Sequence, residues 1–188
     1  IIPWGLGAFD STTQNGPMAR FVEDIALILP VISGPDWIDP SIIEMPLLNP
    51  DLVKISGLRV AMYTSNGIMD PSVETVETIH TAASSLLEVG CLVEEARPSA
   101  LAMLPDLLAL PDSDGRAWLR RLIQKAGTTE IHPWVVKRIN EADIIPMDQF
   151  TALLEKLDQY RSSMLSFMKD YDAILCPVAP FPAPAHGA

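Results

Sequence analysis

A strand–helix–strand pattern in the middle of the chain constrains its fold more than any other feature. Residues 58–63 (LRVAMY) and 91–96 (CLVEEA) are short runs typical of β-strands, and residues 72–89 carry apolar side chains at helical spacing. Asp70 and Pro71 predict the N-cap and the first turn of that helix. Two strands joined by such a helix pair in parallel through a right-handed crossover. We therefore expect an α/β fold in which helix 72–89 packs on one face of the sheet.

The rest of the chain predicts further helices around this unit. A helix is expected at about 21–33, although Phe21 stands where a capping side chain is usual and Pro30 interrupts the last turns. A proline-punctuated connection follows it. Residues 99–143 indicate broken helices, and a long helix is expected from Met147 to Lys169. It leads into residues 173–178 (AILCPV), whose composition is that of a buried strand.

Length and composition are those of one globular domain. The 188 residues are 48% hydrophobic and 20% charged, which is typical of a globular domain that can form its own core. The net charge of −11 argues against a nucleic-acid-binding surface, which needs a basic face. No segment approaches the ~20 apolar residues of a membrane span. No signal peptide is recognised, and we expect a cytoplasmic protein.

The residues of this chain that could act as a nucleophile or a general base are better interpreted as structural. Ser166 and Lys169 match the S-x-x-K spacing of penicillin-recognising enzymes, but the partner motifs are absent and Lys169 is expected in solvent. No serine lies in a glycine-rich turn that would expose it as a nucleophile. Cys91 and Cys176 are interpreted as small buried thiols rather than a disulfide framework. The chain therefore contains no predicted catalytic residue.

The histidines do not predict a metal site. Glu77 and His80 have the Glu-x-x-His spacing of di-iron bundles, which need further carboxylate-bearing helices that this chain does not show, so His80 is expected at a solvated helix edge. His132 precedes a proline and is interpreted as a helix-entry residue. His186 receives no role. A set of apolar residues, which could line a channel or belong to the core, is interpreted as core: Met103, Leu107, Trp118 and Leu119.

Four segments, in order, resemble one family. They are residues 16–40 (GPMARFVEDIALILPVISGPDWIDP), GLRVAMY at 57–63, the helix-and-strand segment that starts at Asp70, and YDAILCPVAPFPAP at 171–184. In this order they resemble the amidase signature family, serine hydrolases that cleave carboxamides. The segments SDGRAWLRRLIQKAGTTEIHP and LEKLDQYRSSMLSFMKDYDAILCP look closest to its fatty-acid amide hydrolase branch.

The resemblance implies that residues 1–188 are the C-terminal part of a single amidase domain. The implied fold is a partial amidase signature fold, a mixed β-sheet flanked by helices and truncated at both ends. It also implies a Ser–cis-Ser–Lys mechanism with no metal or organic cofactor, on motifs that lie outside this chain. Within the chain it transfers only a pocket role, to Cys176, Pro177 and Val178. The implied partner is a small-molecule amide, with a homo-oligomer expected, and with peripheral membrane association if the substrate is a fatty amide.

Two alternative functions stay open. The chain could be a catalytically inactive module that serves only binding or assembly. It could also be part of the A subunit of a glutamine-dependent transamidase, which works with partner chains. The Tyr-Asp-Gly-x-x-Tyr-Gly type of substrate segment found in such subunits is not visible in this sequence.

Overall fold

The computed structural model describes residues 16–38 and 42–185. The chain divides into two compact units. One comprises residues 1–53 and 110–147, and the other comprises residues 54–109 and 148–188. Within the described ranges, no helix combines the length and the apolar character that crossing a membrane requires.

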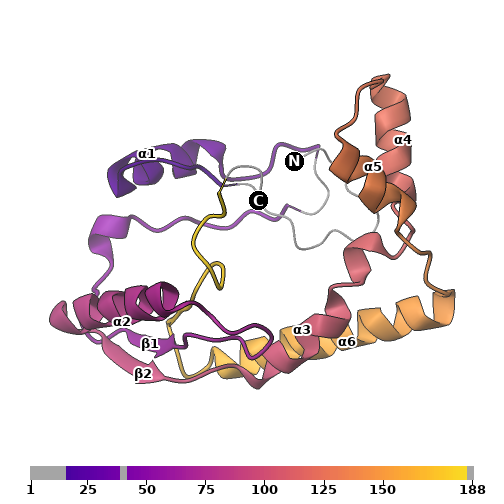
Figure 1. Ribbon diagram of the computed structural model, residues 1–188. Coiled ribbons are helices and arrows are strands. Elements are labelled where there is room, and N and C mark those ends of the chain that lie inside the picture. Colours follow the sequence, from indigo (N-terminus) through magenta and orange to yellow (C-terminus); the bar gives the residue numbers. More distant parts are fainter. Residues whose placement is uncertain (1–15, 39–41, 186–188) are drawn as a thin grey trace. The chain divides into compact units, whose positions relative to one another are not determined.

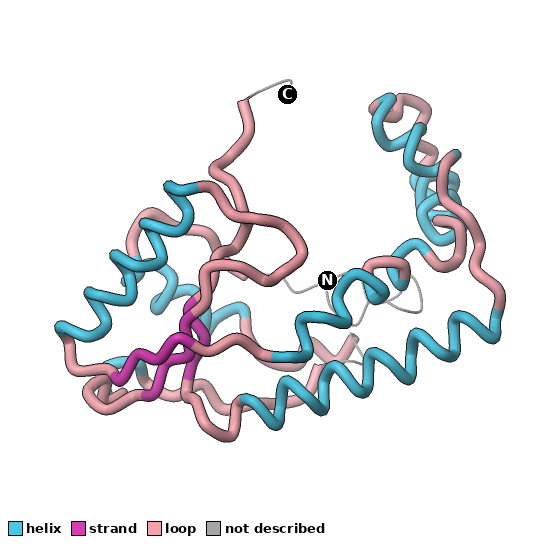
Figure 2. Tube along the Cα trace, turned by 60° about the horizontal axis from the view of Figure 1, so that its bottom comes forward, coloured by secondary structure: helices cyan, strands magenta, loops and turns pink. Residues whose placement is uncertain are grey.

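The second unit contains a parallel sheet of three strands: β1 (Arg59–Met62), β2 (Leu92–Glu95) and β3 (Ala173–Leu175). Their order is β2-β1-β3, and β1 pairs in parallel with both neighbours. Figure 2 shows the three strands side by side. The predicted parallel pairing of 58–63 with 91–96 is confirmed. We expected a mixed sheet, whereas all three strands of the described residues run the same way.

Helix α2 (Val73–Glu88) connects β1 to β2 and packs on the sheet, as predicted (Figure 1). Ile79 and Ala83 form a buried cluster with Met62 of β1, and Val93 and Leu175 pack against it. The buried stripe is narrower than its helical spacing suggested. At the two ends of the stripe, Val73 is 72% exposed and Leu87 is 54% exposed, because the short strands reach only the middle of the helix.

The N-cap of α2 is Ser72, not Asp70 as predicted. The Ser72 hydroxyl accepts a hydrogen bond from the backbone N–H of Thr75 at 3.3 Å. An N-cap side chain typically accepts a hydrogen bond from the N–H of the second or third helical residue, and Thr75 is the third. Pro71 therefore precedes the cap and does not start the helix. Asp70 lies one residue further upstream, out of capping position.

Helix α6 (Met147–Phe167) is the long helix predicted from Met147, and it ends two residues before Lys169. Lys156 of α6 forms an ion pair with Asp106 of α3 (Leu104–Leu107), which follows the 3-10 helix η2 (Ser99–Met103). Strand β3 comes after α6 and stops at Leu175. We expected strand to residue 178, but Pro177 has no N–H to donate to a ladder. Ile174 and Leu175 are half-buried rather than buried.

The first unit is built from short helices. They are α1 (Val22–Ile32), the 3-10 helices η1 (Pro50–Leu52) and η3 (Leu110–Asp112), α4 (Ala117–Ala126) and α5 (Pro133–Asn140). Phe21 occupies the N-cap of α1 without a side-chain hydrogen bond, as its residue type predicted. Pro30 lies inside α1, which ends two residues later. The broken helical character expected for residues 99–143 is confirmed.

Candidate functional site

A pocket of about 120 Å³ opens in the second unit where the strands end. It is lined by Tyr63, Thr64, Ser65, Asn66, Met69, Pro71, Leu101, Leu104, Pro177, Val178, Ala179 and Pro180. Three segments supply this lining: those that follow β1, β2 and β3. All of them leave the carboxyl ends of parallel strands, which is where open α/β sheets bind ligands. This location makes the pocket the candidate functional site.

The loop between β1 and α2 supplies the polar wall of the pocket. Asn66 Oδ1 accepts a hydrogen bond from the backbone N–H of Ile68 at 2.9 Å, and Ser65 Oγ accepts one from that of Gly67 at 3.1 Å. Gly67 has a φ of +78°, which favours glycine. These local bonds fold the loop tightly and hold residues 63–66 beside the pocket. Sequence reasoning missed this wall, although Asn-Gly directly after a strand is a turn signal.

The segment after β3 supplies part of the apolar wall and is tied to α2. The backbone carbonyl of Pro180 accepts hydrogen bonds from the N–H of Ser72 at 2.9 Å and from the hydroxyl of Thr75 at 3.1 Å. The N–H of Tyr63 donates to the Leu175 carbonyl at 3.1 Å. The ends of β1 and β3 and the start of α2 are thereby held together around one cavity.

Two of the three residues assigned to a pocket by sequence, Pro177 and Val178, line this cavity. The third, Cys176, is half-buried and lies beside the Tyr63 hydroxyl. Burial raises the pKa of Tyr63, and its hydrogen bond and proximity to Cys176 raise it further, while Arg97 acts in the opposite direction. Tyr63 is therefore a neutral hydroxyl at physiological pH, placed where the pocket meets the thiol.

The alternative nucleophile pair is not supported by its surroundings. Ser166 and Lys169 are both exposed, and Lys169 lies beyond the end of α6. A lysine base needs desolvation to act near neutral pH, and this one has none. Of the two thiols, Cys91 is buried as expected, whereas Cys176 is only half-buried because it follows the end of β3; both are free.

His80 and His132 take the structural positions expected for them. His80 is exposed on α2. His132 is the N-cap of α5, and its Nδ1 accepts a hydrogen bond from the Trp134 N–H at 3.2 Å. His186 lies outside the described residues. Within residues 16–38 and 42–185, no group of three or more His, Cys, Asp or Glu could hold a metal ion.

None of the four apolar residues considered for a channel lines this pocket. Leu107 is buried, and Met103, Trp118 and Leu119 are half-buried. The interpretation as core is right for Leu107 and only partly right for the other three. The apolar lining that follows β2 comes instead from Leu101 and Leu104.

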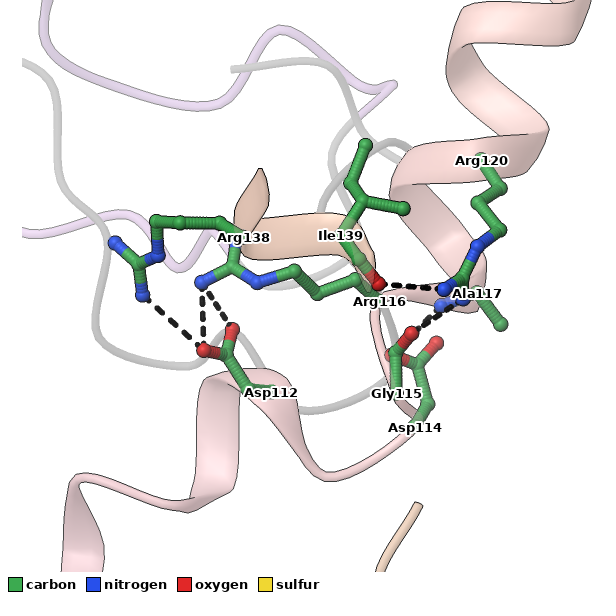
Figure 3. A network of polar contacts seen from close by, with 8 residues as sticks. All are labelled: Asp112, Asp114, Gly115, Arg116, Ala117, Arg120, Arg138 and Ile139. Atoms are coloured by element: carbon green, nitrogen blue, oxygen red, sulfur yellow. Dashed lines mark hydrogen bonds and ion pairs between the residues drawn. The ribbon is translucent and has the colours of Figure 1, made fainter. Parts of the chain in front are cut away.

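A second polar cluster, in the first unit, was not foreseen from the sequence (Figure 3). Asp112 accepts from Arg116 at 2.6 Å and from Arg138 at 3.2 Å. Arg120 donates to the backbone carbonyls of Gly115 and Ile139. The groups come from η3, α4 and α5, and every charge faces a partner or a carbonyl. The cluster is therefore a structural connection between these short helices.

Asp114 lies two residues before Arg116, the N-cap of α4, within the same region. Its carboxylate accepts from the N–H groups of Ala117 at 3.2 Å and Trp118 at 2.9 Å. A negative charge at a helix N-terminus is also favoured by the helix dipole. These two bonds satisfy the first N–H groups of α4 and span its N-cap, Arg116, which has a left-handed conformation with a φ of 58°.

Comparison with known proteins identifies the family. The amidase family model matches residues 4–188, nearly the whole chain. The chain belongs to the amidase family. Among curated relatives, this amidase chain is 31% identical over 125 residues to the A subunit of the glutamyl-tRNA(Gln) amidotransferase of Synechococcus sp. (strain RCC307). That match covers 63% of this chain and 25% of the relative.

Solved amidase structures share the fold. A fatty acid amide hydrolase superposes with a TM-score of 0.73 at 22% identity, over 90% of this chain and 31% of that one. The 6-aminohexanoate cyclic dimer hydrolase, solved in complex with substrate, gives a TM-score of 0.67 at 26% identity, over 90% and 38%. The chain thus spans about a quarter of the length of the curated relatives it matches and about a third of the solved ones.

Proposed function

We propose that this amidase chain belongs to an amide hydrolase in which it completes the sheet and walls the substrate pocket. The observation that carries the proposal is the cavity at the carboxyl ends of β1, β2 and β3, in a chain whose family match extends over residues 4–188. The chain supplies one polar wall and one apolar wall, which suits an amide with an apolar substituent. Pro177 and Val178, with Cys176 behind Tyr63, are the proposed substrate-binding residues.

We assign the catalytic groups to sequence outside these 188 residues. The chain contains no Gly-Gly-Ser-Ser-Gly-Gly-like loop, and its exposed Ser166 has no desolvated base. In the proposed reaction an unprotonated lysine removes the proton of the nucleophilic serine through a bridging serine. The serine attacks the amide carbon, the amine leaves with a proton, and water hydrolyses the acyl-enzyme. Backbone N–H groups stabilise the oxyanion, and no cofactor takes part.

Two branches of the family compete for the finer assignment. We keep hydrolysis of an amide with an apolar acyl chain, of the fatty-amide type, as the first candidate because the apolar wall is open and formed by Leu101, Leu104 and Val178. The A subunit of a transamidase is the second candidate. It is favoured by the 31% identity to the A subunits of glutamyl-tRNA(Gln) amidotransferases.

The test compares the 188-residue chain with the protein encoded by the complete reading frame. We expect the complete protein to release ammonia or amine from simple amides and to be inactivated by a serine-reactive fluorophosphonate. The chain alone should show no turnover above background. Glutamine-dependent activity that requires a co-purified partner protein would favour the transamidase. Turnover by the chain that disappears in Ser166→Ala would overturn the proposal.

A further inference from the structure

Arg97 is an exposed cation that has no carboxylate partner among the described residues, and it lies in the segment after β2 that also supplies Leu101 and Leu104 to the pocket. It follows β2, between Ala96, whose N–H donates to the Met62 carbonyl at 3.0 Å, and the fully buried Pro98. The backbone on both sides of Arg97 is therefore fixed. Among the described residues, no carboxylate oxygen lies within 4.0 Å of its guanidinium.

The Arg97 side chain reaches across to the polar wall. A Cβ placed on Gly67 would lie 2.6 Å from Nη1 of Arg97, so the guanidinium rests directly on the glycine of the β1–α2 loop. The positive charge of Arg97 also lowers the pKa of Tyr63, a residue that lines the pocket, against the larger effects that raise it. Glycine leaves the space that this approach needs.

The residue before Gly67, Asn66, carries a hydrogen-bond donor on the same loop that Arg97 contacts. Asn66 lines the pocket, and its Oδ1 is occupied by the N–H groups of Ile68 and Met69, which leaves its NH₂ without an acceptor among the described residues. Tyr63 is a third residue with a polar side chain on this wall. A guanidinium with a neighbouring amide donor is suited to a carboxylate, which accepts several hydrogen bonds.

We infer that Arg97 is a specificity-determining residue that pairs with a carboxylate carried by the substrate. The substrate class is an amide joined through an apolar chain to a carboxylate: the chain contacts Leu101, Leu104 and Val178, and the carboxylate meets Arg97 and Asn66. This inference rests on the proposed function, since it names the substrate of the same pocket. It narrows that function from apolar amides in general to ω-carboxylated ones.

The test uses two amides of equal length in the complete protein. Adipamate ends in a carboxylate and hexanamide ends in a methyl group. In Arg97→Gln we expect kcat/KM for adipamate to fall roughly 10-fold to 100-fold, mainly through KM, because a hydrogen-bonded charge is lost. Hexanamide should change less than about twofold. Arg97→Lys should recover part of the adipamate activity, and Arg121→Gln, an exposed arginine of the other unit, should change neither.

Two outcomes overturn the inference and leave the proposed function intact. One is an equal loss for both amides, which would mean a structural role. The other is an unchanged kcat/KM for adipamate. If the wild-type protein hydrolyses neither amide, the proposed function is wrong. The role of Arg97 in carboxylate binding can then still be tested by measuring the binding of adipate by calorimetry. The affinity for adipate should weaken at least about tenfold in Arg97→Gln, and absence of binding to the wild type would contradict the inference.

Discussion

Arg59 and Asp172 hold each other by two reciprocal hydrogen bonds. The Asp172 carboxylate accepts from the Arg59 N–H at 2.8 Å, and the Arg59 carbonyl accepts from the Asp172 N–H at 2.8 Å. The pair lies at the entrance of β1 and β3, one residue before their ladder begins at Val60 and Ala173. It therefore sets the register that brings the carboxyl ends of both strands to the pocket.

Replacing this carboxylate should weaken the sheet. We expect Asp172→Ala to lower the free energy of unfolding by about 1 kcal/mol, because a hydrogen bond to a charged but exposed acceptor is lost. Urea denaturation of the complete protein measures it. Asp170→Ala, an exposed neighbour, is the matched control and should change the free energy by less than about 0.5 kcal/mol. Equal effects of the two variants would contradict the register role.

Tyr63 predicts a loss of stability at high pH. Its pKa is raised in the folded protein, and the unfolded chain has the ordinary value near 10.0. Above pH 10 the unfolded chain gives up the proton that the folded protein keeps, so rising pH favours unfolding. The contribution is complete below pH about 10 and declines above it. Urea titrations at pH 8–11 measure this decline, and in Tyr63→Phe this part of it should disappear. In Tyr160→Phe the decline should persist but be smaller, because the Tyr160 charge contributes to raising the pKa of Tyr63.

Enlarging the side chain at Cys176 should change the preference of the protein for the length of the acyl chain. In Cys176→Trp the larger side chain should intrude from the end of β3 toward the cavity. We expect kcat/KM for long acyl amides to fall about tenfold or more relative to acetamide, since each excluded methylene carries a measurable share of binding. Assay of a chain-length series in the complete protein checks this. Cys91→Ala alters a buried thiol outside the pocket lining and should leave the series unchanged.

The cluster around Asp112 predicts a larger stability effect than an ordinary surface ion pair. Arg116 is only 14% exposed and loses its carboxylate in Asp112→Asn. We expect a loss of about 1–3 kcal/mol, because a nearly buried cation is left without its partner. In Asp158→Asn, whose ion pair with Arg161 is 81% and 48% exposed, the expected change is below about 1 kcal/mol. Urea denaturation of the two variants checks this. Similar midpoints for Asp112→Asn and Asp158→Asn would show that the cluster contributes little to the stability of the folded protein.

The sheet edges predict self-association of the 188-residue chain. β2 and β3 each have one neighbour, β1, among the described strands, and Leu92 on β2 is 60% exposed. Unpaired strand edges with apolar side chains recruit other chains. We expect dimers or larger species by size-exclusion chromatography with light scattering, reduced by Leu92→Lys. A monodisperse monomer at about 100 μM, a concentration at which partly exposed edges normally associate, would contradict this.

Local patterns predicted the elements, and tertiary contacts decided their ends. The pairing of β1 with β2 followed from the alternation of apolar strands with a 3.6-residue helix. The cap of α2 moved from Asp70 to Ser72 because its geometry depends on single backbone angles. The Asp112–Arg138 bond joins residues 26 apart and has no signature in spacing. Likewise, Arg97 and Gly67 meet only because β1 and β2 are adjacent.

Since Pro180 accepts two hydrogen bonds from the start of α2, the wall formed by residues 177–180 cannot swing outward alone. Any widening of the pocket on that side would break both bonds or carry the helix with it. Under the proposed function, a substrate too broad for this wall would be excluded rather than accommodated. If the pocket binds substrate as proposed, changes of side-chain size along this wall, rather than loop motion, would alter the range of substrates that related sequences accept.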